Sequence, residues 1–149
     1  MAKRIGAWLM LVGALFAGTV VAADSQDDAA IKEVVDRAYV HGVHIDADPA
    51  KIRSGMHESF IMFVRNGDAV TQLTRDAWIA RIEASNAARK DDAPKPKTTA
   101  DIQVLDRSGD SAVARVNLFR DGKQIFTDYI SLYRFDGGWK LVGKIFHRH

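Results

Sequence analysis

Residues 124–147 read QIFTDYISLYRFDGGWKLVGKIFH. Apolar and aromatic side chains fill both sides of Asp136-Gly137, a dipeptide that is typical of tight hairpin turns. This stretch therefore predicts two long antiparallel strands, Gln124 to Phe135 and Trp139 to His147.

Two earlier segments have the same character. Ile102 to Arg107 and Ala112 to Arg120 are separated by Ser108-Gly109, and Asp121-Gly122 leads into the next strand. We therefore expect the last third of the chain to form a four-stranded antiparallel meander.

Helical periodicity replaces this pattern nearer the start of the chain. Apolar side chains recur at helical spacing at Ile31, Val34, Val35, Ala38 and Gly42. We expect this first helix to begin near Ser25, because Ser25 and Asp28 have the spacing of a capping box.

Two further helices are marked by their caps. Asp48-Pro49 predicts the start of a short second helix that ends at Gly55, and Thr74 predicts the cap of a third. Between them, Phe60 to Arg65 stops at the turn dipeptide Asn66-Gly67 and can pair with the short run from Ala69 to Gln72, which predicts a hairpin. The polar stretch from Asn86 to Lys97 predicts an exposed loop.

The order of these elements predicts an α+β fold, with three N-terminal helices packed on a strongly bent antiparallel sheet. The chain has 149 residues, 47% of them hydrophobic and 27% charged, which is typical of one globular domain. It contains no cysteine, which excludes disulfides, thiolate metal sites and a cysteine nucleophile. We expect residues 24–149 to form a single domain.

Residues 1–23 have the pattern of a secretory signal peptide. Lys3 and Arg4 precede an uncharged apolar run, and small side chains permit cleavage after Ala22 or Ala23. Cleavage predicts a periplasmic or secreted protein with no membrane partner. The uncharged stretch from Ile5 to Ala23 is also just long enough for an uncleaved anchor. Losing residues 1–23 leaves 19 basic against 19 acidic residues, which does not favour a nucleic-acid partner.

The closing segment carries a family resemblance, through Thr127-Asp128-Tyr129, Asp136 to Leu141 and Lys144 to His147, and Met56 to Phe60 adds to it. These residues resemble the nuclear transport factor 2-like superfamily and, within it, the "putative lumazine-binding" branch. The resemblance implies a cone of three helices over a bent sheet, a cystatin-like α+β barrel. It leaves function open, because isomerases, dehydratases, ligand carriers and catalytically silent modules share this fold.

Ketosteroid isomerases of this superfamily allow a test at three positions. Aligning their final hairpin with this one places the acid position at Ser131 and the base position near Val64, with the tyrosine within one residue of Tyr39. Because Val64 cannot accept a proton, we do not expect ketosteroid isomerisation.

The same alignment assigns the two faces of the longest strand. It turns Thr127, Tyr129, Ser131 and Tyr133 toward the cavity under the helices. It turns Phe126, Ile130 and Leu132 outward, where they would form a homodimer interface through the outer sheet face. Asp128 falls on the outward face as well, and we expect it to pair with Arg115 or Lys144.

These assignments predict an exported module that binds a small planar ligand and has no catalytic activity of its own. The expected ligand-binding residues are Tyr39, His57, Trp78, Tyr129 and Ser131. Two alternatives remain: an isomerase or lyase with a histidine base such as His57, and a structural homodimer whose cavity is filled by its own side chains.

Neither a metal nor a cofactor is expected. His41 with His44, and His147 with His149, have spacings that could place two imidazoles on one ion. No carboxylate lies at a ligand-like interval beside either pair, so two separate surface pairs are the better interpretation.

Overall fold

The computed structural model describes residues 17–89 and 95–149, with side chains described from Ser25 onward. Its helices are α1 (Ala17–Val35), the π-helix η1 (Asp36–Ile45), α2 (Pro49–Gly55) and α3 (Arg75–Ala88). Its strands are β1 (Met56–Asn66), β2 (Ala69–Thr74), β3 (Thr98–Ser108), β4 (Ser111–Arg120), β5 (Lys123–Phe135) and β6 (Gly138–Arg148).

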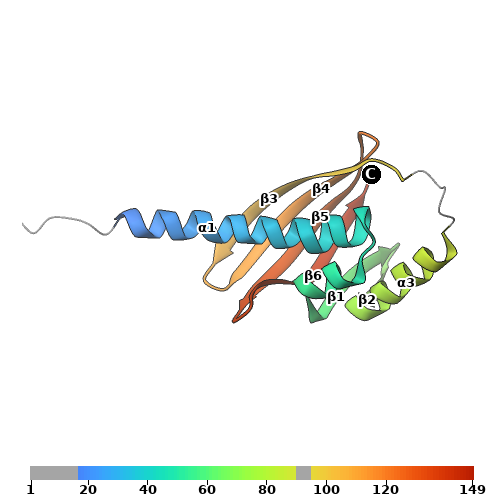
Figure 1. Ribbon diagram of the computed structural model, residues 1–149, viewed down its shortest axis with the longest axis horizontal. Coiled ribbons are helices and arrows are strands. Elements are labelled where there is room, and N and C mark those ends of the chain that lie inside the picture. Colours follow the sequence, from blue (N-terminus) through green and yellow to red (C-terminus); the bar gives the residue numbers. More distant parts are fainter. Residues whose placement is uncertain (1–16, 90–94) are drawn as a thin grey trace, which may run out of the picture.

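The six strands form one sheet in the order β2-β1-β6-β5-β4-β3 (Figure 1). The predicted antiparallel meander from β3 to β6 and the predicted β1–β2 hairpin are both confirmed. The chain crosses from β2 through α3 to the far edge, and the meander then returns it to β1. There β6 lies parallel to β1, with Met56 opposite Leu141. The α+β class is confirmed, and the sheet is mixed and open rather than wholly antiparallel.

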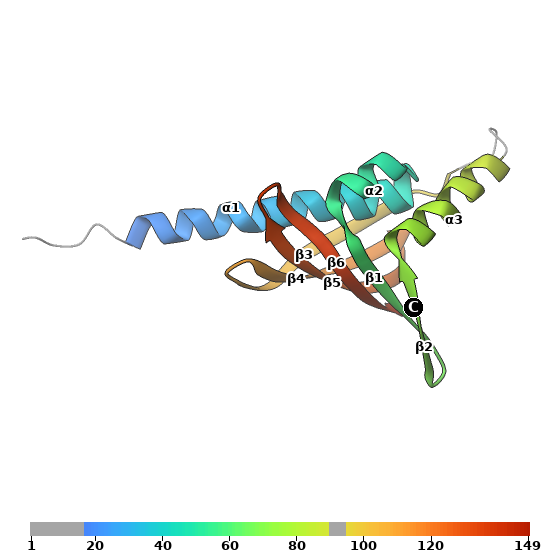
Figure 2. The ribbon, with the colours of Figure 1, turned by 90° about the horizontal axis from the view of Figure 1, so that it is seen from below.

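All three α-helices cover the same face of this sheet (Figure 2). The predicted apolar stripe of the first helix is buried, from Ile31 through Val35 to Ala38. None of the helices in the described residues is long and apolar enough to cross a membrane.

The first helix begins at Ala17, earlier than the predicted start at Ser25, and it runs through Ala22 and Ala23, where cleavage is expected. Most of the predicted signal peptide, residues 1–16, lies outside the described residues.

One carboxylate ties α1 to the sheet. Asp27 accepts hydrogen bonds from the Arg134 guanidinium at 3.1 Å and from the Trp139 indole N–H at 3.3 Å. The Arg107 guanidinium lies 3.3 Å from Oδ2 of the same carboxylate. The tryptophan of the closing hairpin thus helps to dock the first helix.

The predicted caps of the second and third helices are confirmed. The Asp48 carboxylate accepts the N–H of Ala50 at the start of α2, and the Thr74 hydroxyl accepts that of Ala77 at the start of α3. The second helix ends at Gly55 as predicted, where a side chain would collide with Ala38. The third helix continues to Ala88, past the predicted start of the loop at Asn86.

Candidate ligand-binding site

The long first helix changes from α to π geometry over the inner face of the sheet. At the end of η1, the Asp46 N–H donates to the carbonyl of His41, five residues earlier, at 2.8 Å. Hydrogen bonding at this interval brings residues five apart onto one side of the helix. Tyr39 and His44 meet in this way, with ring centroids 4.9 Å apart in an edge-to-face contact.

The expectation that His41 and His44 share a helix face is therefore wrong. Side chains three apart lie on one face of an α-helix but not of a π-helix. His41 is half-exposed, and its Nδ1 lies 3.1 Å from the Asp46 carboxylate. His44 turns the other way, toward Phe126 on β5, at a centroid distance of 6.4 Å.

A buried ion pair lies beneath this helix. The Lys144 ammonium on β6 donates to one oxygen of Asp128 on β5, and the Tyr39 hydroxyl donates to the other oxygen at 2.7 Å. Lys144 also donates to the Tyr39 hydroxyl oxygen at 2.8 Å. Asp128 is 0% and Lys144 6% exposed. The predicted pairing of Asp128 with Lys144 is confirmed, whereas Arg115 bonds to Gln103 instead.

Burial governs the titration of this cluster. Removal of water lowers the pKa of the Lys144 ammonium, an effect that the nearby Asp128 carboxylate opposes. Burial, followed by the charge of Asp128 and the hydrogen bond to it, raises the pKa of Tyr39 well above its usual range. Tyr39 therefore stays protonated at neutral pH.

Aromatic rings surround the ammonium group. Lys144 Nζ lies 4.8 Å from the ring centroid of Tyr39, 5.7 Å from Trp78, 5.8 Å from Phe126 and 4.6 Å from Phe146. These ring faces contribute cation–π attraction and exclude water. Polar and aromatic side chains of this protein thus fill the deep part of the cone.

A cavity of about 350 Å³ opens at the end of the cone where η1, the segment before β3 and the end of β4 meet. It is lined by Val43, His44, Ile45, Ala47, Arg89, Lys95, Pro96 and Arg120. His44 links it to the deep cluster, because its ring also contacts that of Tyr39.

The His44 imidazole is neutral in the folded protein. Burial, together with the positive charges of Lys144 and Arg120, lowers its pKa to about 3. Its Nε2 is buried and has no hydrogen-bond partner among the described residues.

The predicted orientation of β5 is reversed. Ile130 and Leu132 are 0% and 1% exposed and pack beneath the helices, with Phe126 partly buried against the same core. They do not lie on an outer face, so they cannot form the predicted dimer interface. Asp128 belongs to this inner face as well.

The expected ligand-binding residues divide between two faces. Tyr39 and Trp78 lie together inside, with ring centroids 6.2 Å apart. Tyr129 is 40% exposed, and it lines a shallow depression on the outer face together with Ser131. Their predicted orientation toward the cavity is therefore wrong.

His57 is also separated from the inner pair. Its ring stacks on exposed Phe135 at 4.7 Å, and its Nδ1 accepts the Ser59 N–H at 3.2 Å.

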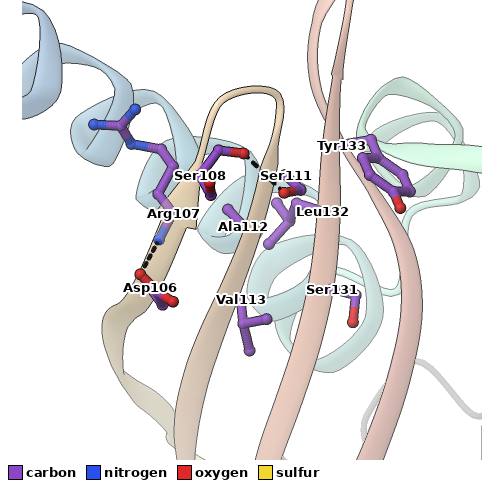
Figure 3. A pocket seen from close by; sticks show the side chains of 9 residues that line it. All are labelled: Asp106, Arg107, Ser108, Ser111, Ala112, Val113, Ser131, Leu132 and Tyr133. Carbon is purple, nitrogen blue, oxygen red and sulfur yellow. Dashed lines mark hydrogen bonds between the residues drawn. The ribbon is translucent and has the colours of Figure 1, made fainter.

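A second depression, of about 240 Å³, lies near the β3–β4 turn. Val113 on β4 and Ser131 and Tyr133 on β5 contribute to its wall (Figure 3).

The described histidines do not form a metal-binding cluster. Within the described residues, no three histidine or carboxylate side chains come close enough to hold an ion. His147 and His149 touch edge to face at 4.8 Å, and His149 Nε2 lies 2.9 Å from the Thr127 hydroxyl.

Sequence reasoning missed the residues that line the cavity. Arg89 and Lys95 lie between α3 and β3, whereas Arg120 ends β4, and nothing in their spacing predicts that they line one cavity. The interval of five residues between Tyr39 and His44 predicts that their rings meet only if a π-helix is expected at this point of the chain.

Helices on one face of an open, bent sheet, with a cavity at one end, define a nuclear transport factor 2-like fold. Solved structures of such proteins of unknown function superpose on this chain. The one from Silicibacter pomeroyi DSS-3 has 21% identity and a TM-score of 0.63 over 85% of this chain and 98% of its own. The one from Shewanella baltica OS155 has 24% identity and a TM-score of 0.65 over 84% and 95%.

An uncharacterised protein from Caulobacter vibrioides, described as having a cystatin-like fold, is similar over 83% of this chain and 90% of its own, with 17% identity and a TM-score of 0.60. No curated protein matches the sequence. The chain belongs to the family described as "Putative lumazine-binding", whose sequence model matches residues 26–147.

Removing one partner of the buried pair should destabilise the fold strongly. Asp128→Asn leaves the Lys144 ammonium buried without a countercharge, which should lower the free energy of unfolding by about 3–5 kcal/mol in urea denaturation. The double variant Asp128→Leu with Lys144→Met should recover most of this loss. Asp101→Asn, at an exposed position of β3, serves as control and should change stability by less than about 0.5 kcal/mol. An equally small effect of Asp128→Asn would contradict the assignment.

His44 should make the protein acid-sensitive. The unfolded chain protonates this histidine below about pH 6.5, whereas the folded protein does so only near its pKa of about 3. Between these values the unfolded state binds more protons, so stability falls as the pH is lowered. Urea unfolding at about pH 7 and about pH 5 should show a loss of about 2 kcal/mol due to His44.

His44→Phe should lack this part of the loss. Val43→Ala, which changes the same turn but keeps the imidazole, should retain it. Equal pH dependence in wild type and His44→Phe would refute a buried, neutral His44.

Proposed function

We propose that this protein is an exported small-molecule-binding module whose ligand enters the cavity at the open end of the cone. The cavity carries the proposal: its volume of about 350 Å³ lies within the range of ligand pockets, and its wall combines apolar side chains with a few polar ones. The family description, which names a small heteroaromatic compound, supports a planar ligand.

Binding without catalysis is the role that the local chemistry favours. His44, the histidine in the cavity wall, has a pKa of about 3 and is a weak base at neutral pH. The Asp128 carboxylate is engaged by Tyr39 and Lys144. The alternative base His57 stacks on Phe135, outside the residues that line the cavity. These observations support a binding module over an isomerase or lyase.

Ligand binding should depend on the cone and not on the outer sheet face. We expect a thermal-shift panel of pterins, flavins, small aromatic acids and steroids to contain a stabilising compound. Its effect should be about 2.7 kcal/mol at a concentration near 100 times its Kd. Native mass spectrometry of the purified protein would reveal a ligand that co-purifies.

Two variants locate the site. Val43→Phe should fill the cavity and abolish the shift, whereas Ser131→Ala, on the outer face, should leave it intact. A shift that survives Val43→Phe but is lost in Ser131→Ala would place the ligand on the outer face and contradict the proposal.

We further propose that two copies associate through the outer face of the sheet. This face exposes large apolar side chains from four strands: Phe63, Val113, Tyr129, Tyr133, Phe135 and Ile145. An exposed apolar patch of this kind on a small protein favours a protein partner. On β5, the proposed interface therefore contains Tyr129 and Tyr133. The residues predicted from the sequence, such as Ile130, lie on the opposite face of the strand.

Ile145→Lys should disrupt this dimer, because Ile145 is 56% exposed and a charge there would be buried on association. Light scattering coupled to size exclusion should give a dimer for wild type and a monomer for the variant. Ala80→Lys, at an exposed position of α3, is the matched control and should stay dimeric. A wild-type monomer at micromolar concentration would contradict the proposal.

A further inference from the structure

The wall of the open-end cavity has an unbalanced charge. Three cations, which we call the cationic rim, line it: Arg89, Lys95 and Arg120. Among the residues that the structure describes, no carboxylate lines the same cavity, and none of the three cations forms an ion pair. Within this part of the chain, the charge of the rim is not neutralised.

Three described acidic residues close in sequence to the cavity lining have other partners. Asp46 binds Lys51 at 2.6 Å and also contacts His41. Asp48 accepts the N–H groups that begin α2, and Asp121 accepts the backbone N–H of Lys97 at 2.9 Å. None of these three carboxylates neutralises the rim.

The potential in the cavity is positive at its inner wall too. Burial first, and then the charges of the buried Lys144 and of Arg120, disfavour the protonated form of His44 in the cavity wall. The same field attracts an anion that enters the cavity.

The wall opposite the rim is firmly held. Ala47 has a left-handed backbone with φ of 52°, which is uncommon for a residue other than glycine. Its carbonyl accepts a hydrogen bond from the Asn86 side chain at 2.8 Å, and the Asp48 N–H bonds to the carbonyl of Gly42 at 2.7 Å. A strained residue persists only where its surroundings fix it, so this part of the cavity wall is held in place.

We propose that this cavity binds a small organic anion, with its carboxylate or phosphate group on the cationic rim. Arginine guanidinium groups bind both kinds of anion through paired N–H donors. The apolar part of the ligand packs on Val43, Ile45 and Pro96, which line the same cavity. This inference rests on the proposed function and adds to it the charge of the ligand.

Three probes that share one ring test the inference: benzoate, phenyl phosphate and the neutral benzamide. Their affinities are measured by titration of the ¹⁵N-labelled protein, following the amide signals of residues 43–47. We expect at least one of the anions to bind about tenfold more tightly than benzamide, a difference of about 1.4 kcal/mol. The ratio between benzoate and phenyl phosphate tells a carboxylate site from a phosphate site.

Arg120→Gln should remove most of this preference for the anion, and Arg120→Lys should retain part of it. Arg81→Gln is the matched control: it removes the same charge from an exposed position of α3 and should leave the preference unchanged. Raising the salt concentration should weaken the binding of the two anions and leave the binding of benzamide unchanged.

Two results would overturn the inference. If benzamide shifts the cavity signals as strongly as the anions do, the cationic rim does not select for negatively charged ligands. The cavity would then still bind small molecules, and the proposed function would stand. If no probe gives a saturable shift there at millimolar concentration, or if Arg120→Gln binds the anions like wild type, the anion site is refuted. A compound from the thermal-shift panel that binds in the cone would still uphold the proposed function.

Discussion

A lysine ammonium enclosed by protein needs a countercharge, and this requirement shapes the interior of the cone. Lys144 meets it with Asp128 on the neighbouring strand and with the hydroxyl of Tyr39 on the helix above. The contact joins the β5–β6 hairpin to η1, since Tyr39 lies 89 residues before Asp128 in the chain. A pair of this kind adds little stability compared with apolar side chains of equal size, but breaking it is costly. Both partners of the pair are buried, Asp128 on β5 and Lys144 on β6.

The same lysine connects the structural core with the proposed site. Burial, together with the charges of Lys144 and Arg120, keeps the His44 imidazole neutral. The deep cone is occupied by Tyr39, Trp78 and the ammonium they surround, so space for a ligand remains at the open end. The π-helix is part of this arrangement. Its geometry places side chains five residues apart on one side of the helix, so Tyr39 and His44 both face the sheet.

The burial of Asp128 on the inner face of β5 determines which side chains of this strand lie on the outer face. With Asp128, Ile130 and Leu132 directed inward, alternation along β5 places Tyr129 and Tyr133 outside. The helices cover only the other face, so these aromatic side chains remain exposed. The fold therefore has two distinct surfaces on which the proposals rest: a cavity lined by cations at one end of the cone, and an exposed apolar face of the sheet.

Local chemistry was readable from the sequence alone. Asp48-Pro49 and Thr74 began the second and third helices, Asn66-Gly67 and Asp136-Gly137 turned the chain, and the closing segment indicated the family, because caps and turns depend on neighbouring residues. The faces of β5 were not readable, since both carry apolar side chains and a shift of one residue exchanges them. Nor could the cavity be predicted, because Arg89 and Lys95, between α3 and β3, come together with Arg120, at the end of β4, only in the folded chain. Tertiary structure decided these points, because the partner that makes burial of Asp128 possible lies on another strand.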